Sequence, residues 1–254
     1  MSTGAELNRR CDLLRSLHVP GSPLVLPNAW DVPSARAVVE AGFPVVATTS
    51  GGVAETLGYE DHEGAPAAEM LAAAGRIARA VDAPVTIDAE SGYRMAPADL
   101  VEALAGADAA GCNLEDTDHS TGRLTDPDRQ AERLAAIRAA ARERGYGLVV
   151  NARVDVFLAD RQSPQAGLVD QAAARARAYL AAGADCVYPI FLAEPAPIRA
   201  FVDAAGGPVN ILGLLTAPSR DELAAMGVAR ISYGSLLHRR TMDRLTELLA
   251  EIPH

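Results

Sequence analysis

Short apolar runs recur along the chain, and each has the length of a single buried strand. Eight of them stand at 23–28, 43–50, 83–90, 111–116, 147–155, 186–190, 208–212 and 229–234. Between them lie Ala-rich amphipathic stretches such as 97–108, 128–145 and 169–185, whose apolar spacing indicates helices. Strands that alternate with helices in this way predict parallel strands joined by crossover helices.

Eight such units predict a (β/α)8 barrel of the TIM type. We expect residues 1–254 to form this barrel as a single domain, with an extra helix at the N-terminus. Several helices finish on a glycine just before the next strand, as in EAGFPVV, GADAAGCNL, AAGADCVYP and AMGVARIS, where a left-handed helix cap suits glycine. A doubly wound open sheet is the alternative. It is disfavoured because eight units exceed its usual number and no G-x-G-x-x-G follows the first strand.

Composition restricts the partners. The chain is 49% hydrophobic and only 4% aromatic, which predicts an aliphatic core, and its net charge of -10 argues against a nucleic acid or an anionic membrane surface. A small molecule fits better, and an anionic one needs local positive charge. The start lacks the pattern of a secretory signal and no apolar run approaches about 18 residues, so we expect a cytoplasmic protein without a membrane span. Cys11, Cys112 and Cys186 are expected to be buried thiols, because they lack metal-ligand spacing.

Acidic side chains follow the third and fourth predicted strands. Asp88 and Glu90 stand two apart, so strand alternation places both on one side, and Glu115 ends the neighbouring strand. Three carboxylates this close repel one another unless a proton or a cation intervenes. Oxygen ligands without a His or Cys cluster favour Mg²⁺, with Mn²⁺ as a possible substitute. The alternative is that polar residues at these ends only mark where the fold meets water.

Other polar residues follow the same strand ends. Arg153 either clamps a substrate carboxylate or phosphonate, oriented by Asp155, or only forms a structural salt bridge with it. After the second strand, backbone N–H groups of a small turn predict a nest for an anionic oxygen, and Asp61 lies in a loop that can fold over the mouth. The residues of this turn are Ser50, Gly51 and Gly52. A further polar residue, Asn210, stands in the seventh predicted strand.

The polar segment 115–129 has the length and the glycine, at 122, that suit a lid. Within it, His119 either acts as an acid or base or is an idle exposed side chain, and Arg123 can meet an anion.

Six motifs carry a resemblance to a known family. TTSGG, GYED, VTIDAESGY, GCNLED, NARVD and GVARISYG stand in the order and spacing of the isocitrate lyase and phosphoenolpyruvate mutase superfamily, which the chain resembles from about Pro23 to Leu237. The resemblance implies a barrel with Mg²⁺ at its mouth and α-keto or 2-hydroxy acid substrates, whose C–C or P–C bond breaks to give an enolate-like intermediate. It also implies a homo-oligomer, a dimer or tetramer that exchanges a C-terminal helix.

The resemblance assigns roles to the residues already noted. Asp88 would ligate Mg²⁺, while Glu90 and Glu115 would reach the metal directly or through water. Asp61 and Arg153 would complete the pocket. The substrate carboxylate would be held by Ser50, Gly51 and Gly52.

The chain departs from the family pattern at several positions. Glu90 replaces an aspartate, Ile190 stands where the lyases have a glutamate, and the segment 210–213 is Asn-Ile-Leu-Gly rather than Asn-x-Thr-Glu. The loop 117–125 lacks both the Lys-x-Cys-Gly-His of those lyases and the Lys- and Asn-rich loop of the phosphonate mutases. We therefore expect a Mg²⁺-dependent lyase that cleaves a C–C bond of a small 2-keto or 2-hydroxy di- or tricarboxylate, similar to oxaloacetate decarboxylase or methylisocitrate lyase. The alternatives are a P–C bond mutase or hydrolase, and a barrel that binds a metabolite without turnover.

Overall fold

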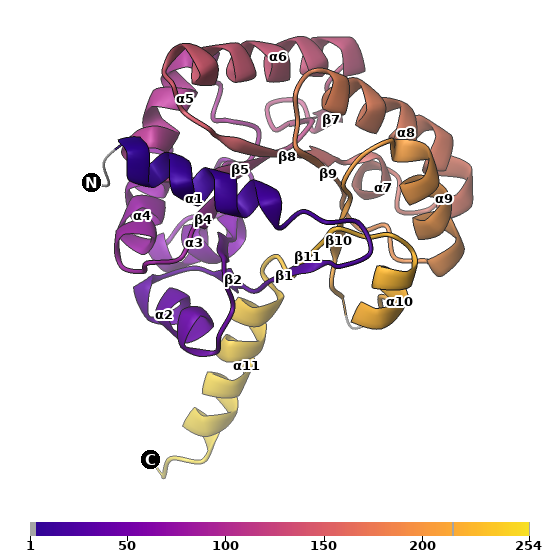
Figure 1. Ribbon diagram of the computed structural model, residues 1–254. Helices are drawn as coiled ribbons and strands as arrows, with labels where there is room; N and C mark the ends of the chain where they lie inside the picture. Colours follow the sequence, from indigo (N-terminus) through magenta and orange to yellow (C-terminus); the bar gives the residue numbers. More distant parts are fainter. Residues whose placement is uncertain (1–3, 215, 254) are drawn as a thin grey trace.

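Parallel strands follow one another around the centre of the molecule (Figure 1). The computed structural model describes residues 4–214 and 216–253. One sheet has the order β1–β11–β10 and the other β2–β3–β4–β5–β8–β9. The strands are β1 (Leu24–Leu26), β2 (Asn28–Ala29), β3 (Val46–Thr48), β4 (Val85–Asp88), β5 (Gly111–Leu114), β8 (Val149–Val154), β9 (Cys186–Pro189), β10 (Asn210–Leu212) and β11 (Arg230–Ser232).

The two sheets adjoin at both edges. Only Pro27 separates β1 from β2 along the chain, and Val187 of β9 forms a parallel bridge with Val209, just before β10. Each of the eight predicted apolar runs contains a strand at one position of this series. The prediction of an α/β fold of the TIM-barrel type is confirmed.

Helices lie outside the strands, and most of them connect one strand to the next. The barrel helices are α2 (Val32–Glu40), α3 (Ser50–Leu57), α4 (Ala67–Arg79), α5 (Pro97–Gly106), α6 (Pro127–Glu143), α7 (Val156–Ala159), α8 (Gln165–Ala181), α9 (Pro195–Ala205) and α10 (Arg220–Ala225). An antiparallel hairpin of β6 (Thr117–Asp118) and β7 (Arg123–Leu124) is inserted between β5 and α6. The segment predicted to be a lid therefore has a regular backbone.

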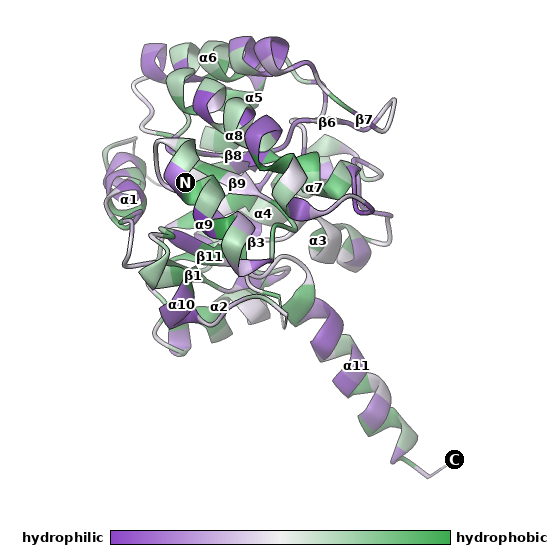
Figure 2. Cartoon of the chain, turned by 90° about the vertical axis from the view of Figure 1, so that its right-hand side faces the viewer, coloured by the Kyte–Doolittle hydropathy of each residue, from purple (hydrophilic) through white to green (hydrophobic). Residues whose placement is uncertain are grey.

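The extra N-terminal helix, α1 (Gly4–Ser16), covers the amino ends of the strands. Arg15 donates to Asp185 at 2.8 Å and to the carbonyl of Gly147 at 2.8 Å, and both partners come just before a strand. Cys11 and Leu14, on the inner face of this helix, are buried. Figure 2 shows α1 and the β6–β7 hairpin on opposite sides of the molecule, so the carboxyl ends of the strands stay free for a site.

The glycine caps are confirmed for three of the four phrases. Gly42, Gly183 and Gly227 have φ of 88°, 104° and 85°, the left-handed conformation that follows a helix end. After α5 this conformation falls on Asp108 instead, with φ of 56°. Gly111 has another role, because a Cβ there would lie 2.7 Å from the carbonyl oxygen of Val149.

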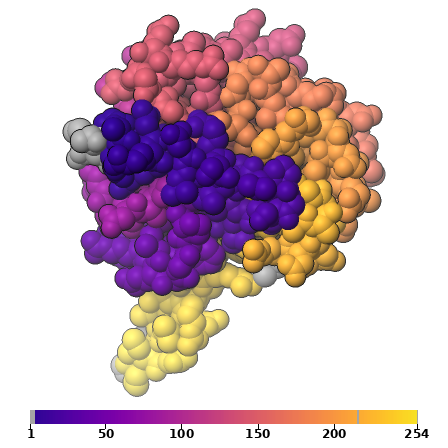
Figure 3. All heavy atoms as spheres, viewed as in Figure 1, coloured from indigo at the N-terminus to yellow at the C-terminus, as the bar shows by residue number. Residues whose placement is uncertain are grey.

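The core is aliphatic, as composition predicts, and the three cysteines are buried and free. Within the described residues, no helix is long and apolar enough to cross a membrane. The last helix, α11 (Leu236–Ala250), stands away from the body (Figures 2 and 3). Its exposed apolar side chains are Met242, Leu245, Leu248 and Leu249, and Ile252, two residues beyond the helix, is exposed as well.

Candidate active site

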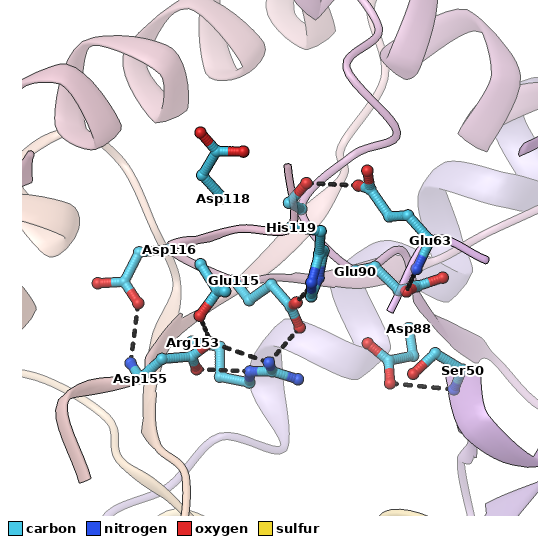
Figure 4. A network of polar contacts seen from close by, with 12 residues as sticks. Ser50, Glu63, Asp88, Glu90, Glu115, Asp116, Asp118, His119, Arg153 and Asp155 are labelled. Atoms are coloured by element: carbon cyan, nitrogen blue, oxygen red, sulfur yellow. Dashed lines mark hydrogen bonds and ion pairs between the residues drawn. The ribbon is translucent and has the colours of Figure 1, made fainter. Parts of the chain in front are cut away.

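The acidic residues predicted to lie at the mouth come together at the carboxyl ends of β4 and β5 (Figure 4). Asp88 is the last residue of β4, Glu90 comes two residues later, and Glu115 follows β5 directly. Arg153 enters from the neighbouring strand β8. The parallel order of these strands therefore gathers residues that are up to 65 positions apart in the sequence.

Asp88 is held in place through both its backbone and its side chain. Its backbone N–H donates to Oγ1 of Thr48 at 2.9 Å, and its Oδ2 accepts a hydrogen bond from the backbone N–H of Ser50 at 3.1 Å. The other oxygen, Oδ1, is buried and has no hydrogen-bond partner among the described residues. A buried carboxylate oxygen without a partner is costly, so this atom is a candidate for binding a cation.

The segment predicted to be a nest is instead the start of a helix. Ser50, Gly51 and Gly52 form the first turn of α3, and the N-cap residue Thr49 makes no side-chain capping bond. The first N–H groups of a helix lack intrahelical acceptors. Here the N–H of Ser50 donates to Asp88, and binding of a substrate anion by this turn stays a prediction. A Cβ on Gly51 would lie 2.8 Å from Oδ2 of Asp61, so glycine allows the loop carrying Asp61 to pack closely here.

Glu90 reaches the mouth by a different route from the one predicted. Strand alternation does not apply to it, because β4 ends at Asp88 and Glu90 has a left-handed φ of 49°. Its carboxylate accepts a hydrogen bond from the backbone N–H of Glu63. Burial raises the pKa of Glu90 to about 8, and the carboxylates of Asp88, Asp61 and Glu115 add to this shift. The expected crowding of carboxylates is therefore present.

Glu63 is a site residue that sequence reasoning missed. Its carboxylate accepts hydrogen bonds from Oγ of Ser91 and from the backbone N–H of Tyr93, the latter at 2.8 Å. These contacts fasten the loop after α3 onto the loop after β4. The acidic phrase EDHEG offered a weak signal, but only the left-handed φ values of His62 (66°) and Glu63 bring it here.

Arg153 forms the salt bridge with Asp155 that was considered for it, and its role in clamping a substrate stays a prediction. Its guanidinium binds Asp155 through Nε at 2.6 Å and Nη2 at 2.9 Å, and it also forms an ion pair with Glu115. The bidentate pair fixes the plane of the guanidinium, which then points toward the acidic mouth. Burial raises the pKa of Glu115 to about 7 even though Arg153 opposes the shift.

The β6–β7 hairpin brings His119 to the mouth. Nε2 of His119 contacts Oε1 of Glu115, and the ring lies 5.3 Å from that of His62. Burial lowers the pKa of His119, but the contact with Glu115 outweighs burial and leaves the pKa above its ordinary value. His119 is thus a partner of a buried carboxylate rather than an idle exposed side chain.

Asp116, also at the end of β5, points away from the mouth. Its carboxylate accepts hydrogen bonds from Tyr179 at 2.6 Å and Arg175 at 2.9 Å, both on α8, and from the backbone N–H of Asp155 at 2.8 Å. This buried network anchors the end of β8 and hence the partner of Arg153. Its role is structural, and Asp116 is fully buried rather than exposed to water.

The barrel interior holds further polar residues. Asn210 is fully buried and donates to Oγ of Ser232 at 3.0 Å, so its contact with a substrate stays a prediction. Arg230, which sequence reasoning missed, is also fully buried. It donates to Asn113 at 3.3 Å, while its Nε and Nη1 have no partner in the described part of the chain.

The residues fit a divalent cation in chemistry, although no group of three or more His, Cys, Asp or Glu side chains within residues 4–214 and 216–253 is arranged as a finished metal site. Two buried oxygens of the described mouth lack partners, Oδ1 of Asp88 and Oδ1 of Asp61. Carboxylate oxygens are what Mg²⁺ prefers, and Mg²⁺ usually keeps several waters and takes only one or two carboxylates from a protein. The donor set therefore suits Mg²⁺, and the role of Asp88, Glu90 and Glu115 as its ligands stays a prediction.

The fold and the acidic mouth define a barrel of the kind found among lyases and mutases. Comparison with known proteins agrees: the family model for phosphoenolpyruvate phosphomutase matches residues 14–253. The 2-methylisocitrate lyase of Salmonella typhimurium is 30% identical over 255 residues, covering 91% of this chain and 84% of that protein. The chain belongs to the phosphoenolpyruvate mutase family, within the phosphoenolpyruvate mutase and isocitrate lyase superfamily.

Solved structures lead to the same family. A Burkholderia cenocepacia protein provisionally assigned as a phosphonomutase is 45% identical, with a TM-score of 0.90, over 96% of this chain and 100% of that one. A 2,3-dimethylmalate lyase is 26% identical, with a TM-score of 0.84, over 99% of this chain and 85% of that one.

Proposed function

We propose that this protein is a Mg²⁺-dependent lyase that cleaves a C–C bond of a small 2-keto or 2-hydroxy di- or tricarboxylate. The observation that carries the proposal is Oδ1 of Asp88, which has no hydrogen-bond partner in the described part of the chain and is buried at a mouth where Glu90 and Glu115 also converge. Asp88 would hold the cation directly, and Glu90 and Glu115 would reach it directly or through water. When bound, such a cation supplies positive charge that polarises a substrate oxygen.

The chain's own residues would position the substrate. The first turn of α3 would bind one carboxylate through the N–H groups of Gly51 and Gly52 and the hydroxyl of Ser50, whose own N–H already donates to Asp88. Arg153, held flat by Asp155, would bind the anionic group that leaves or remains after cleavage. The bond then breaks with the negative charge developing between these donors, where preorganised positive groups lower the barrier most.

Asp61 and His119 would complete the chemistry. His119 lies on a hairpin next to Glu115, where it can hold a proton and pass it to the enolate carbon of the product. Asp61 packs against the first turn of α3 with one oxygen free, where it can accept the proton of a 2-hydroxyl group. The hairpin and the loop of Glu63 would keep bulk water from the enolate.

The direct test is turnover of a panel of acids by metal-free protein with and without added Mg²⁺. Oxaloacetate, 2-methylisocitrate and 2,3-dimethylmalate are offered separately, and the keto-acid product is followed by a coupled dehydrogenase. Product formation that requires both Mg²⁺ and the protein supports the proposal, because Mg²⁺ alone promotes decarboxylation of oxaloacetate in solution. Failure of Mg²⁺ to bind, together with no cleavage of any of these acids, contradicts it.

A P–C bond enzyme is the second candidate, favoured by the match to the phosphoenolpyruvate phosphomutase family model and by the Burkholderia structure. Phosphorus NMR of phosphonopyruvate incubated with the protein separates the two, because a mutase or hydrolase moves the phosphorus resonance and a C–C lyase leaves it unchanged. Stabilisation by these ligands without any product would instead indicate a metabolite-binding barrel.

A further inference from the structure

A second polar pocket lies beside the mouth, on the side of the hairpin that faces α6. It has a volume of about 680 Å³, within the range of small-molecule sites. Four arginines line it, and we call it the arginine pocket. They come from three segments: the loop after β4, the hairpin strand β7 and the helix α6, which supply Arg94, Arg123, and both Arg129 and Arg133.

None of these four arginines forms an ion pair with a described carboxylate, although the chain has a net charge of -10. The carboxylates lining the same pocket are engaged elsewhere. Asp118 accepts hydrogen bonds from Ser120 at 2.6 and 2.9 Å, and Asp126 caps the start of α6 through the N–H groups of Asp128 and Arg129. Glu115, the third acid, is paired with Arg153. The hydrogen bonds from Ser120 lower the pKa of the Asp118 carboxyl, and Arg94 lies near enough to add to this shift. The four arginines nevertheless outnumber the three carboxylates, and the pocket keeps a net positive charge.

The position of Arg133 in this pocket depends on a glycine in the loop after β4. A Cβ on Gly92 would lie 2.6 Å from Nη2 of Arg133. The same nitrogen makes only one long hydrogen bond, of 3.4 Å, to the carbonyl of Met95. Gly92 has a left-handed φ of 91°, so glycine there serves both the turn and the approach of the guanidinium. Burial lowers the pKa of Arg133. The negative charge of Glu63 opposes this shift, and the positive charge of the neighbouring Arg129 adds to it.

The helix start itself does not explain the pocket. Asp126 already accepts hydrogen bonds from the first N–H groups of α6, at 3.1 and 3.2 Å, so the side chains rather than the helix terminus supply the donors. An arginine presents up to five donors in a planar fork that matches carboxylate and phosphate oxygens. Four such groups around one space suit a ligand with more than one negative charge.

We propose that the arginine pocket binds a multiply charged oxyanion, of the chemistry shared by phosphate and tricarboxylates, and that this ligand holds the β6–β7 hairpin against α6. The coupling follows from the hairpin's own contacts. Arg123 on β7 lines the pocket, while Thr117 and His119 of the same hairpin contact Asp155 and Glu115. An anion that bridges Arg123 to Arg129 and Arg133 would therefore fix the side chain of His119 over the mouth.

The oxyanion has two possible sources: the distal group of the substrate, or a separate effector. Both share the chemistry recognised by the arginines, and Glu115 lines the pocket as well as the mouth. The proposal does not depend on the proposed lyase activity, because binding is measured without turnover.

The test uses metal-free, full-length protein with citrate and inorganic phosphate as ligands, followed by calorimetry and thermal melting at low ionic strength. Citrate is expected to bind and raise Tm, and the double variant Arg129→Gln/Arg133→Gln to weaken binding by roughly tenfold or more. Arg142→Gln is the matched control, since Arg142 is an exposed arginine in the last turn of the same helix. Arg123→Gln, at an exposed position, repeats the test should the double variant not fold.

The outcomes separate the sources and can reject the site. The same titration is then repeated with Mg²⁺ added. Citrate binding that survives Asp88→Asn under these conditions identifies an effector, whereas binding lost in that variant as well as in Arg129→Gln/Arg133→Gln identifies the substrate's distal group. Absence of binding by both anions, or equal binding by the double variant and the Arg142→Gln control, overturns the proposal.

Discussion

Oδ2 of Asp88 accepts a hydrogen bond from the backbone N–H of Ser50 at 3.1 Å, while Oδ1 of the same carboxylate is buried without a partner in the described residues. One oxygen thus fixes the orientation and the other is left for a ligand. The start of α3 and the end of β4, which are 38 residues apart, meet in this contact.

Asp88→Asn should therefore remove activity while leaving the fold intact. An amide cannot replace the carboxylate as a ligand of a hard cation, so we expect kcat/KM to fall by at least about 100-fold and Mg²⁺ affinity to fall with it. Mn²⁺ binding followed by electron paramagnetic resonance measures the affinity. Asp170→Asn, at an exposed position of α8, is the control and should change neither quantity. Full activity in Asp88→Asn would exclude this residue as the metal ligand.

The metal-free protein should lose stability as the pH rises from about 5 to about 8. Glu90 has a folded-state pKa of about 8, above its ordinary value of 4.5, so the folded state binds the extra proton in this window. The free energy of unfolding then falls by up to about 1.4 kcal/mol per pH unit for this group. Urea unfolding at pH 6 and pH 8 measures it.

Glu90→Gln should flatten this pH dependence, because the variant has no proton to lose. It should also be more stable than the wild type at pH 8 in the absence of metal. Identical pH profiles for Glu90→Gln and the wild type would show that Glu90 is ionised throughout.

His119→Ala should lower kcat more than KM changes. The side chain contacts Glu115 and would deliver a proton, so we expect a loss of kcat of roughly 10²- to 10⁴-fold, typical of a lost general acid. Thr121→Ala, an exposed change in the same hairpin, controls for effects on the hairpin itself. Steady-state kinetics of both variants at saturating Mg²⁺ separates the loss of the imidazole from an effect on the hairpin. A change in KM alone would assign His119 to binding instead.

Two glycine-to-alanine changes should affect different properties, substrate binding in one case and stability in the other. In Gly51→Ala the new Cβ would lie 2.8 Å from Oδ2 of Asp61, so the loop must shift and KM should rise by roughly tenfold. Gly167→Ala, on α8, meets nothing within 4 Å and should raise the free energy of unfolding by about 0.5–1 kcal/mol. Kinetics and urea unfolding of both variants check this. An unchanged KM in Gly51→Ala would show that the loop of Asp61 does not support the substrate site.

The exposed apolar face of α11 should hold copies of the chain together, as the expected homo-oligomer requires. Leu245 and Leu249 are 45% and 53% exposed, and α11 borders a groove of about 590 Å³ lined by residues of α2 such as Ala37. We expect Leu245→Glu/Leu249→Glu to lower the molar mass measured by light scattering, while Asp243→Lys, a polar change on the same helix, leaves it unchanged. Equal masses for the double variant and the wild type would remove α11 from the interface.

The sequence located most of the acidic mouth because parallel strands bring their carboxyl ends to one place. Asp88 and Glu115 follow from that rule alone. Glu90 does not, since its position depends on one left-handed φ, and Glu63 was missed because two such φ values turn its loop. Asp116 shares the end of β5 with Glu115 but points to α8, and pattern could not separate these two neighbours.

By itself, the sequence determined the α/β order, the aliphatic core and the strand ends where acidic residues gather, because apolar spacing and glycine caps act over a few residues. Only the tertiary structure decided which polar groups meet: Glu63 with Glu90, Arg153 with both Asp155 and Glu115, and four arginines around one pocket. Such contacts join residues distant in sequence through the packing of whole elements and the backbone angles of a few loop residues. A local sequence pattern contains neither the packing of the elements nor these backbone angles.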